Sequence, residues 1–375
     1  MISDRDRPES LIMESLMREL VHLSTTSPFV KRVDEYSAAF ACHPGNVRKR
    51  NEDKVVQADI QIKSGFTYRC AIVCDGVGGL QAGDMASAVA VSAFVAFITA
   101  SEPRRSLADL LEATVRHVDD VVRHELNGRG ATTLCALVRS HEGEVAAVSI
   151  GDSRIYSWEP QSHLIRQVSI DDTIENELRG LNLHNASVLD ARGLRGSLSQ
   201  AIGEVGRSSE SLRVSILTEK DLQFSGAILA TDGVWRSSEE AFNLIATNCH
   251  SAAELARRAI TFAAWAGGVD NSSLFAIEDI SQFGADLVAA QLGQGARCSV
   301  WLGDSKVVVP ITQSNAETQQ SIKDATFKKR LPRRSQSKHQ RIASLAFEQT
   351  RAKPQHPDSP NETIDVSDDE RPEKP

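Results

Sequence analysis

The sequence has few cysteines, and none of the six forms a C-x-x-C pair: Cys42, Cys70, Cys74, Cys135, Cys249 and Cys298. They are scattered along the chain and lie mostly within apolar runs. This pattern argues against a structural zinc site and against a disulfide framework, because both need closely spaced cysteines. We expect reduced, buried thiols, as in a cytoplasmic protein.

A long hydrophobic run is also missing. The longest apolar stretch, residues 86–100, contains serine and is shorter than the roughly 20 residues that cross a bilayer. The first ten residues show no basic segment followed by an apolar one, so no secretory signal is expected. The sequence therefore predicts a soluble protein without a transmembrane segment.

The chain has no excess of positive charge. Its formal net charge is −8 over 375 residues, which argues against nucleic-acid binding by the whole chain. Residues 323–341 differ, because they carry eight lysines and arginines with little apolar support. We expect residues 312–375 to form a disordered charged tail. Its basic run is either simply solvated or binds an acidic partner, nucleic acid or an anionic membrane.

The rest of the chain divides into three parts. Residues 1–30 contain an amphipathic helical pattern, which we expect to dock on the main domain. The sequence pattern of residues 34–280 predicts one domain. Residues 281–311 keep some apolar content and predict a short extension, with a strand near 307–310.

Short strands and paired helices alternate irregularly within the main domain. Helices are expected over 84–100 and 107–126, packed as an antiparallel hairpin because only about six residues join them. Strands are expected over 36–42, 68–74, 132–139, 144–150, 154–159, 163–169, 227–231 and 272–278. The middle four strands suggest one meander. The absence of regular βαβ alternation favours an α+β layered fold.

Four aspartates stand at the ends of these expected strands. Asp75 and Asp232 follow apolar strands and precede glycine, Asp53 opens a strand, and Asp270 precedes one. A single Asp-Gly pair is most often only a turn, so the inference rests on the whole set. Carboxylates that converge at buried strand ends would be desolvated and would repel one another. A divalent cation offsets both effects, and hard oxygen ligands favour Mg²⁺ or Mn²⁺ over zinc.

Seven ordered sequence elements surround these aspartates: HPGNVRKRNED at 43–53, AIVCDGVGG at 71–79, GATT at 130–133, VSIGDSR at 148–154, LSQAIG at 198–203, ILATDGVW at 228–235 and VDN at 269–271. Together they resemble the type-2C, or PPM, metal-dependent serine/threonine protein phosphatases, of a bacterial type. The resemblance extends over residues 40–277. It implies a four-layer α-β-β-α sandwich, in which two antiparallel sheets are flanked by helix pairs.

The resemblance also implies roles for individual residues. Arg48, Asp75 and Asp232 would be the catalytic residues, with Arg48 at the substrate phosphate. Asp75 would bridge two Mn²⁺ or Mg²⁺ ions, and Asp152 would help to hold a third, weaker ion. The implied metal ligands are Asp53, Asp75, Gly76, Asp152, Asp232 and Asp270, with Glu52 beside a metal-bound water.

The implied reaction is hydrolysis of phosphoserine and phosphothreonine in proteins, without a covalent intermediate. A water bridging two ions would lose a proton and attack phosphorus in line with the leaving oxygen. The planar guanidinium of Arg48 matches phosphate oxygens. The implied partner is a phosphorylated protein, the target of a serine/threonine kinase in signal transduction, and we expect the phosphatase to be a monomer.

Two departures from the family pattern limit what carries over. The family's Thr-x-Asp-His element is replaced by Ser-Ile-Asp-Asp at 169–172, so we expect water to protonate the leaving group. Residues 171–206, the expected flap over the site, match no substrate-specific type. Arg154, in the element at 148–154, is expected to pair structurally with a nearby carboxylate.

Two other functions compete with this interpretation. The first is a pseudophosphatase, a phosphoprotein-binding scaffold on the same fold. Degenerate members usually lose metal-binding aspartates, and here all the expected ones remain, which favours an active enzyme. The second is nucleic-acid binding by the tail, which predicts a salt-dependent affinity that disappears when residues 312–375 are deleted.

Overall fold

The structure is a computed structural model that describes residues 8–22, 27–33, 37–77, 82–102, 106–181, 189, 192–194, 196–291 and 295–311. The predicted tail, 312–375, lies outside the described residues. Met1–Gln313 form one compact unit.

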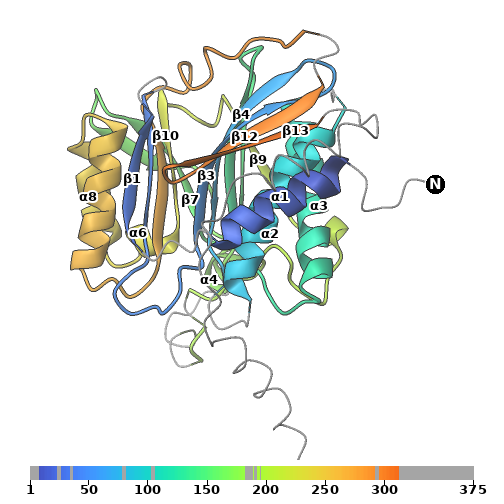
Figure 1. The fold of residues 1–375 in the computed structure, drawn as a ribbon. Coiled ribbons are helices and arrows are strands. Elements are labelled where there is room, and N and C mark those ends of the chain that lie inside the picture. Colours follow the sequence, from blue (N-terminus) through green and yellow to red (C-terminus); the bar gives the residue numbers. More distant parts are fainter. Residues whose placement is uncertain are drawn as a thin grey trace, which may run out of the picture. The chain divides into compact units, whose positions relative to one another are not determined.

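Two antiparallel sheets form the centre of this unit (Figure 1). The six-stranded sheet runs in the order β1 (Phe29–Val33), β2 (Ala38–His43), β11 (Ser272–Ile277), β10 (Gly226–Ala230), β7 (Arg154–Glu159) and β8 (Leu164–Gln167). The seven-stranded sheet runs in the order β13 (Ser305–Ile311), β12 (Ala296–Leu302), β3 (Lys54–Gln61), β4 (Thr67–Cys74), β5 (Leu134–Ser140), β6 (Val145–Ile150) and β9 (Ser215–Thr218).

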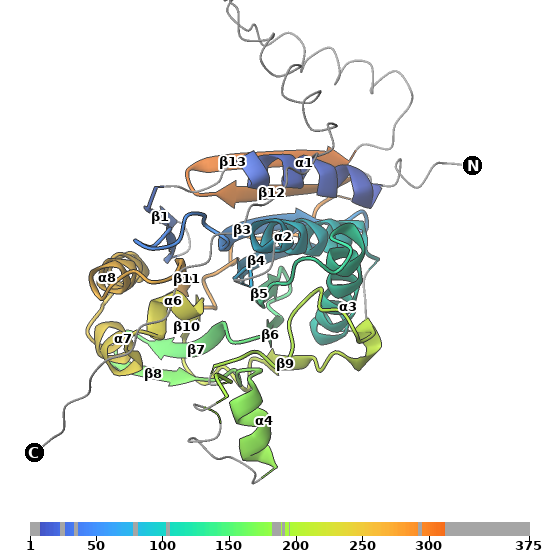
Figure 2. The same cartoon turned by 90° about the horizontal axis from the view of Figure 1, so that it is seen from below.

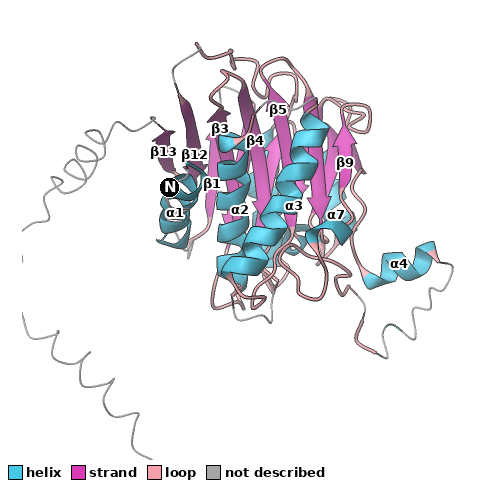
Figure 3. Ribbon diagram, turned by 90° about the vertical axis from the view of Figure 1, so that its right-hand side faces the viewer, coloured by secondary structure: helices cyan, strands magenta, loops and turns pink. Residues whose placement is uncertain are grey.

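Helices cover the outer face of each sheet, so the unit has the predicted α-β-β-α layers (Figure 2). The helices α1 (Pro8–His22), α2 (Gly83–Ala100) and α3 (Leu107–Glu125) cover the seven-stranded sheet (Figure 3). The helices α7 (Glu239–Thr247) and α8 (Ala252–Trp265) cover the six-stranded sheet. Two short helices, α4 (Ile174–Gly180) and α6 (Asp232–Trp235), and the 3-10 turn η3 (Ser209–Ser211) lie in connecting segments.

The apolar spacing of the sequence explains this helix layer. In α3, one face is apolar and buried, and the Ser106 side chain caps the helix by accepting from the Asp109 N–H. The helix α2 is apolar on all sides and is mostly buried between the sheet and the other two helices. Within the described residues, α2 is long and apolar enough to cross a membrane, but its burial identifies it as a core helix. The predicted N-terminal helix docks through Ile12, Leu16 and Leu20.

The prediction of a single meander was wrong. The β5–β6 hairpin lies in one sheet and the β7–β8 hairpin in the other. The chain crosses between the sheets at residues 151–153, because β6 pairs with β9 while β7 pairs with β10. This crossing brings Asp152 to the same end of the sandwich as the strand-end aspartates.

Residues 296–311 form a longer hairpin than the single short strand expected from the sequence. The strand β12 pairs along its length with β3, in the register Val300↔Ala58. The hairpin β12–β13 therefore extends the seven-stranded sheet, and Val300 and Leu302 join the core beneath α1 and α2. The edge strand β1 was not predicted at all.

Candidate active site

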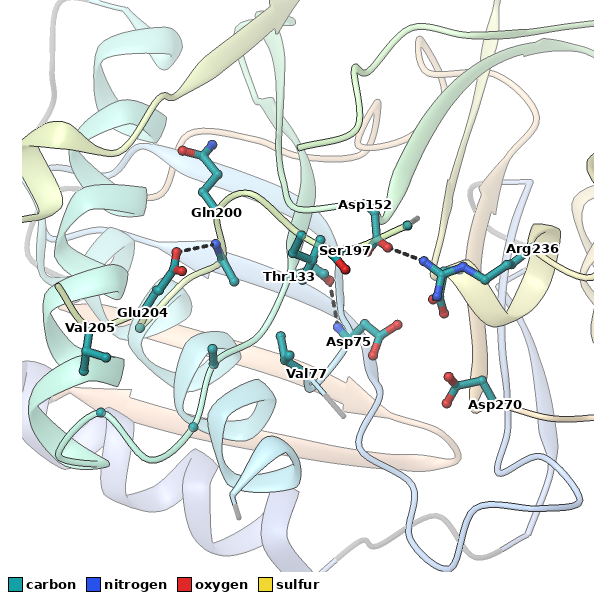
Figure 4. Close-up of a pocket in the computed structure, with 18 of the residues that line it drawn as sticks. Asp75, Val77, Thr133, Asp152, Ser197, Gln200, Glu204, Val205, Arg236 and Asp270 are labelled. Carbon is teal, nitrogen blue, oxygen red and sulfur yellow. Dashed lines mark hydrogen bonds and ion pairs between the residues drawn. The ribbon is translucent and has the colours of Figure 1, made fainter. Parts of the chain in front are cut away.

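The predicted site residues gather in a pocket at one end of the sandwich (Figure 4). The cavity measures about 580 Å³. Its charged lining comes from both sheets and from the loops between them: Arg48, Asp75, Asp152, Glu204, Asp232, Arg236 and Asp270. Asp53 and Gly76 do not line the cavity; both are buried, and Asp53 is only 1% exposed.

Asp75 follows directly after β4, and two threonines hold its backbone. The Asp75 N–H donates to Thr133 Oγ1 at 2.9 Å, and Thr132 Oγ1 donates to the Asp75 carbonyl oxygen at 2.8 Å. These threonines come from the GATT element, so its role is to orient the aspartate. Burial raises the pKa of Asp75 well above its ordinary value, and the carboxylates of Asp53 and Asp232 raise it further.

Two glycines permit close approaches of backbone at this end of the sandwich. A Cβ on Gly76 would lie 2.3 Å from the carbonyl oxygen of Gly83. A Cβ on Gly233 would lie 1.8 Å from the carbonyl oxygen of Asn271. Both contacts are shorter than real Cβ atoms tolerate, so only glycine fits after Asp75 and Asp232.

Asp53 lies directly before β3, beneath the pocket. Its Oδ2 accepts from Thr231 Oγ1 at 2.9 Å, whereas its buried Oδ1 has no hydrogen-bond partner among the described residues. Burial raises the pKa of Asp53 to about 7. A buried carboxylate oxygen without a partner is rare in folded proteins and indicates a missing cation or donor.

Asp270 and Arg48 meet at the rim of the pocket. Arg48 Nη2 donates to Asp270 Oδ2 at 2.6 Å, and this bond is the main cause that raises the pKa of the arginine. Asn271, next in the chain, joins the loops by donating to the carbonyl oxygens of Pro44 and Arg50 and accepting from the Glu52 N–H. The predicted phosphate contact therefore lies in the pocket, paired here with a predicted metal ligand.

Arg236 is a site residue that the sequence interpretation missed. It pairs with Asp152 at 2.5 Å between Nη2 and Oδ2, and through Nη1 with Asp232. Figure 4 shows it beside Asp152, with Asp75 and Asp270 close by. The signal was available in the sequence, because Arg236 stands four residues after Asp232 and a helical turn places such residues on one face.

The carboxylates of the site repel one another. Burial, followed by the charge of Asp232, raises the pKa of Asp152 to about 7, and burial also raises the pKa of Asp232 although Arg236 opposes it. Buried Asp232 Oδ1, like Asp53 Oδ1, lacks a hydrogen-bond partner in the described part of the chain. This all-oxygen donor set suits a hard divalent cation.

The aspartates are gathered but are not already arranged as a complete set of side-chain ligands. No group of three His, Cys, Asp or Glu side chains within the described ranges has the geometry of a metal site. Arginines hold three of the carboxylates, Asp152, Asp232 and Asp270.

Residues 169–172, the segment that lacks the family's histidine, make structural contacts through Asp171 and Asp172. Asp171 forms a buried pair with Arg154 at 2.8 Å, which confirms the structural role expected for that arginine. Asp172 Oδ2 accepts from the Gly151 N–H at 2.9 Å and from Gln200 Nε2 at 2.8 Å. Neither carboxylate lines the pocket.

Comparison with known proteins agrees with this site. The sequence profile described as "Protein phosphatase 2C" matches residues 47–244, more than half of the chain. The chain therefore belongs to the protein phosphatase 2C family. Its helix α1 and its hairpin β12–β13 lie outside the matched residues.

Individual relatives are bacterial phosphatases. The serine/threonine phosphatase stp of Listeria monocytogenes serotype 4b is 29% identical over 267 residues, covering 66% of this chain and 98% of its own. Protein phosphatase PhpP of Streptococcus pneumoniae is 27% identical over 207 residues, covering 53% and 81%. The crystal structure of serine/threonine phosphatase Stp1 from Staphylococcus aureus has the same fold, with a TM-score of 0.54, 19% identity and coverage of 66% and 98%. The protein is thus an enzyme of the bacterial PPM phosphatase type.

Proposed function

We propose that the protein hydrolyses phosphoserine and phosphothreonine in proteins and depends on Mn²⁺ or Mg²⁺. One observation carries the proposal: four aspartates from separate elements line a pocket together with Arg48, and a fifth, Asp53, is buried beside them. Two buried oxygens of this set lack hydrogen-bond partners in the described structure. The named relatives, which are serine/threonine phosphatases, support the same reaction.

The ligands proposed for two cations are Asp53, Asp75, the Gly76 carbonyl oxygen, Asp232 and Asp270. The family resemblance alone assigns Asp152 to a third ion. When bound, the cations would supply a hydroxide nucleophile by lowering the pKa of a coordinated water. The protein contributes the position of Asp75, which Thr132 and Thr133 hold through its backbone.

Arg48 binds the substrate phosphate in this proposal. Its side chain is 38% exposed and lines the pocket, so a phosphate group can reach the guanidinium. The guanidinium offers paired donors to phosphate oxygens and offsets negative charge in the transition state. Because Asp171 and Asp172 are engaged elsewhere, water remains the proposed acid for the leaving oxygen.

Phosphate release from a phosphothreonine peptide tests the function. The wild-type chain should be active with Mn²⁺ and lose its activity in EDTA, and Asp232→Asn should be inactive under both conditions. A pseudophosphatase would bind the phosphopeptide without releasing phosphate. Activity that persists in EDTA would contradict the metal-dependent reaction.

The proposal also covers location, oligomeric state, partners and domain limits. We propose a cytoplasmic monomer, and the supporting observation on location is that all six cysteines are buried and none forms a disulfide. We propose a phosphorylated substrate of a serine/threonine kinase as the partner. We also propose an acidic partner for the tail, which lies outside the described residues, and comparing the full chain with residues 1–311 tests it. The proposed domain limits of 34–280 are tested by comparing the activity of residues 34–280 with that of residues 1–311.

A further inference from the structure

Arg236 occupies a position that the metal-dependent reaction does not by itself explain. Its guanidinium bridges the carboxylates of Asp152 and Asp232, both only 7% exposed, while the arginine side chain remains 47% exposed in the pocket. It is a cation supplied by the chain itself, placed between two residues that the family resemblance assigns to metal ions.

The short helix α6 determines where this guanidinium lies. The Arg236 N–H donates to the Asp232 carbonyl oxygen at 2.7 Å, so the two side chains share one face of a helical turn. Trp235, between them in sequence, has its ring 3.4 Å from the Arg154 guanidinium carbon. Because Arg154 is itself paired with buried Asp171, the turn that carries Arg236 is anchored to the core.

Asp152 reaches Arg236 from the chain segment that crosses between the sheets. The Asp152–Arg236 contact is 2.5 Å, and the carboxylate is nearly buried. A charged hydrogen bond in such a setting is stronger than an exposed ion pair. Since Arg236 is tethered one turn from Asp232, its effective concentration at Asp152 is high, and a weakly held free ion would have to displace it.

The net charge of the site also argues against a further ion at Asp152. Metal ligands bind in their deprotonated form, so in the loaded site the five aspartates carry five negative charges. Arg48 and Arg236 supply two positive ones, which leaves an excess of three. Two divalent cations more than neutralise this excess. A third ion would add charge where Arg236 already compensates Asp152.

We propose that Arg236 is a built-in counter-cation for Asp152, so that the loaded site takes two divalent ions and excludes a third. This inference rests on the proposed metal-dependent function. Arg236 acts on Asp152 and Asp232 and is therefore a positioning residue. The arginine takes over the part that the sequence assigned to a third ion at Asp152.

The number of bound Mn²⁺ ions tests this proposal directly. Equilibrium dialysis of the full chain, with metal counted by mass spectrometry, should give two ions for the wild type and for Asp152→Asn. Arg236→Ala should bind one additional ion, with an affinity at least about ten-fold weaker than the first two, since it would have few charged ligands. The double variant Arg236→Ala/Asp152→Asn should return to two.

Two control variants separate charge position from overall charge. Arg236→Lys keeps a cation at this place and should retain two ions. Arg213→Ala removes an exposed arginine that pairs with Glu177 and lies 3.8 Å from Asp172, neither of which lines the pocket, and should also retain two. Thermal unfolding in EDTA gives a second readout: Arg236→Ala should unfold at a lower temperature than Arg213→Ala, because it leaves two nearly buried carboxylates without a cation.

The outcomes distinguish this inference from the function on which it rests. Three ions in the wild type, or two in Arg236→Ala, would overturn the role of Arg236 and leave the proposed function intact. A wild type that binds fewer than two ions would overturn the proposed metal-dependent function, and this inference with it.

Discussion

Buried charge is compensated at one end of the strand pair β3–β4 and left uncompensated at the other. Near the start of β4, the Arg69 side chain is 1% exposed and forms two bonds to Asp59, at 2.7 and 3.0 Å, and two to Asp286, at 2.6 and 3.1 Å. At the opposite end, Asp53 and Asp75 flank the same strands with raised pKa values, and neither pairs with an arginine in the described part of the chain.

The difference shows how to separate a structural charge cluster from a functional one. The Arg69 cluster contains its own counter-charges, so its energy contributes to the fold. The aspartate cluster keeps buried oxygens without partners in the described structure, and this cost is offset only when something binds. Substitutions at the two ends should therefore have opposite effects on stability and on activity.

The largest expected effect is on activity at the aspartate end. Asp75→Asn removes the charge of a proposed metal ligand, so phosphopeptide hydrolysis with Mn²⁺ should fall by roughly a thousand-fold or more. Unfolding in EDTA should be unchanged or shifted to higher temperature. Near wild-type rates of phosphate release would exclude the two-metal assignment.

At the other end, stability should change and metal binding should not. Arg69→Met removes the charged hydrogen bonds to Asp59 and Asp286, and we expect a loss of about 1.5–3 kcal/mol in the free energy of unfolding. The matched control is Arg50→Met, because Arg50 is 72% exposed and pairs with Asp84 at 3.3 Å. That control should cost at most about 1 kcal/mol in urea unfolding. Equal losses in the two variants would remove the distinction between the ends.

The pH dependence of metal-free stability sharpens the comparison further. Asp53 ionises near 3.8 when exposed but keeps its proton to about pH 7 in the folded protein. Between these values the folded state binds more protons, so its stability falls as pH rises. Asp53→Asn has no such titrating group and should not show this loss. In EDTA, the free energy of unfolding of Asp53→Asn, relative to that of the wild type, should therefore rise by about 2 kcal/mol from pH 5 to 7.5. A constant difference across that range would contradict the raised pKa.

The smallest expected effect concerns substrate binding. Arg48→Ala removes charged hydrogen bonds to the phosphate and should mainly raise KM, lowering kcat/KM by roughly 10-fold to 100-fold. Steady-state kinetics on a phosphothreonine peptide measure the effect. An unchanged KM would show that Arg48 serves only to hold Asp270.

The helices and the aspartates could be predicted from the sequence because their signals are local. Helical periodicity defined α3, and apolar runs that end in Asp-Gly defined the strands before Asp75 and Asp232. The fold class followed from the ordered motifs. These features depend on neighbours in the chain, which the sequence shows directly.

What could not be predicted depends on distant partners. The crossing at 151–153 looks locally like a hairpin, and only the pairing of β6 with β9 and of β7 with β10 reveals it. The hairpin β12–β13 depends in the same way on β3. Arg236 is different, because its signal is local: it was missed because the helical turn α6, which begins at Asp232, was not expected.

The most direct test of the central claim, that the aspartate end is completed by divalent cations, is thermal unfolding with and without Mn²⁺. At about 100 times its dissociation constant, Mn²⁺ should raise the wild-type midpoint by roughly 5 °C or more. Asp75→Asn should show little or no rise, while Arg69→Met should start lower and show the full rise. An equal rise in wild type and Asp75→Asn would contradict the account.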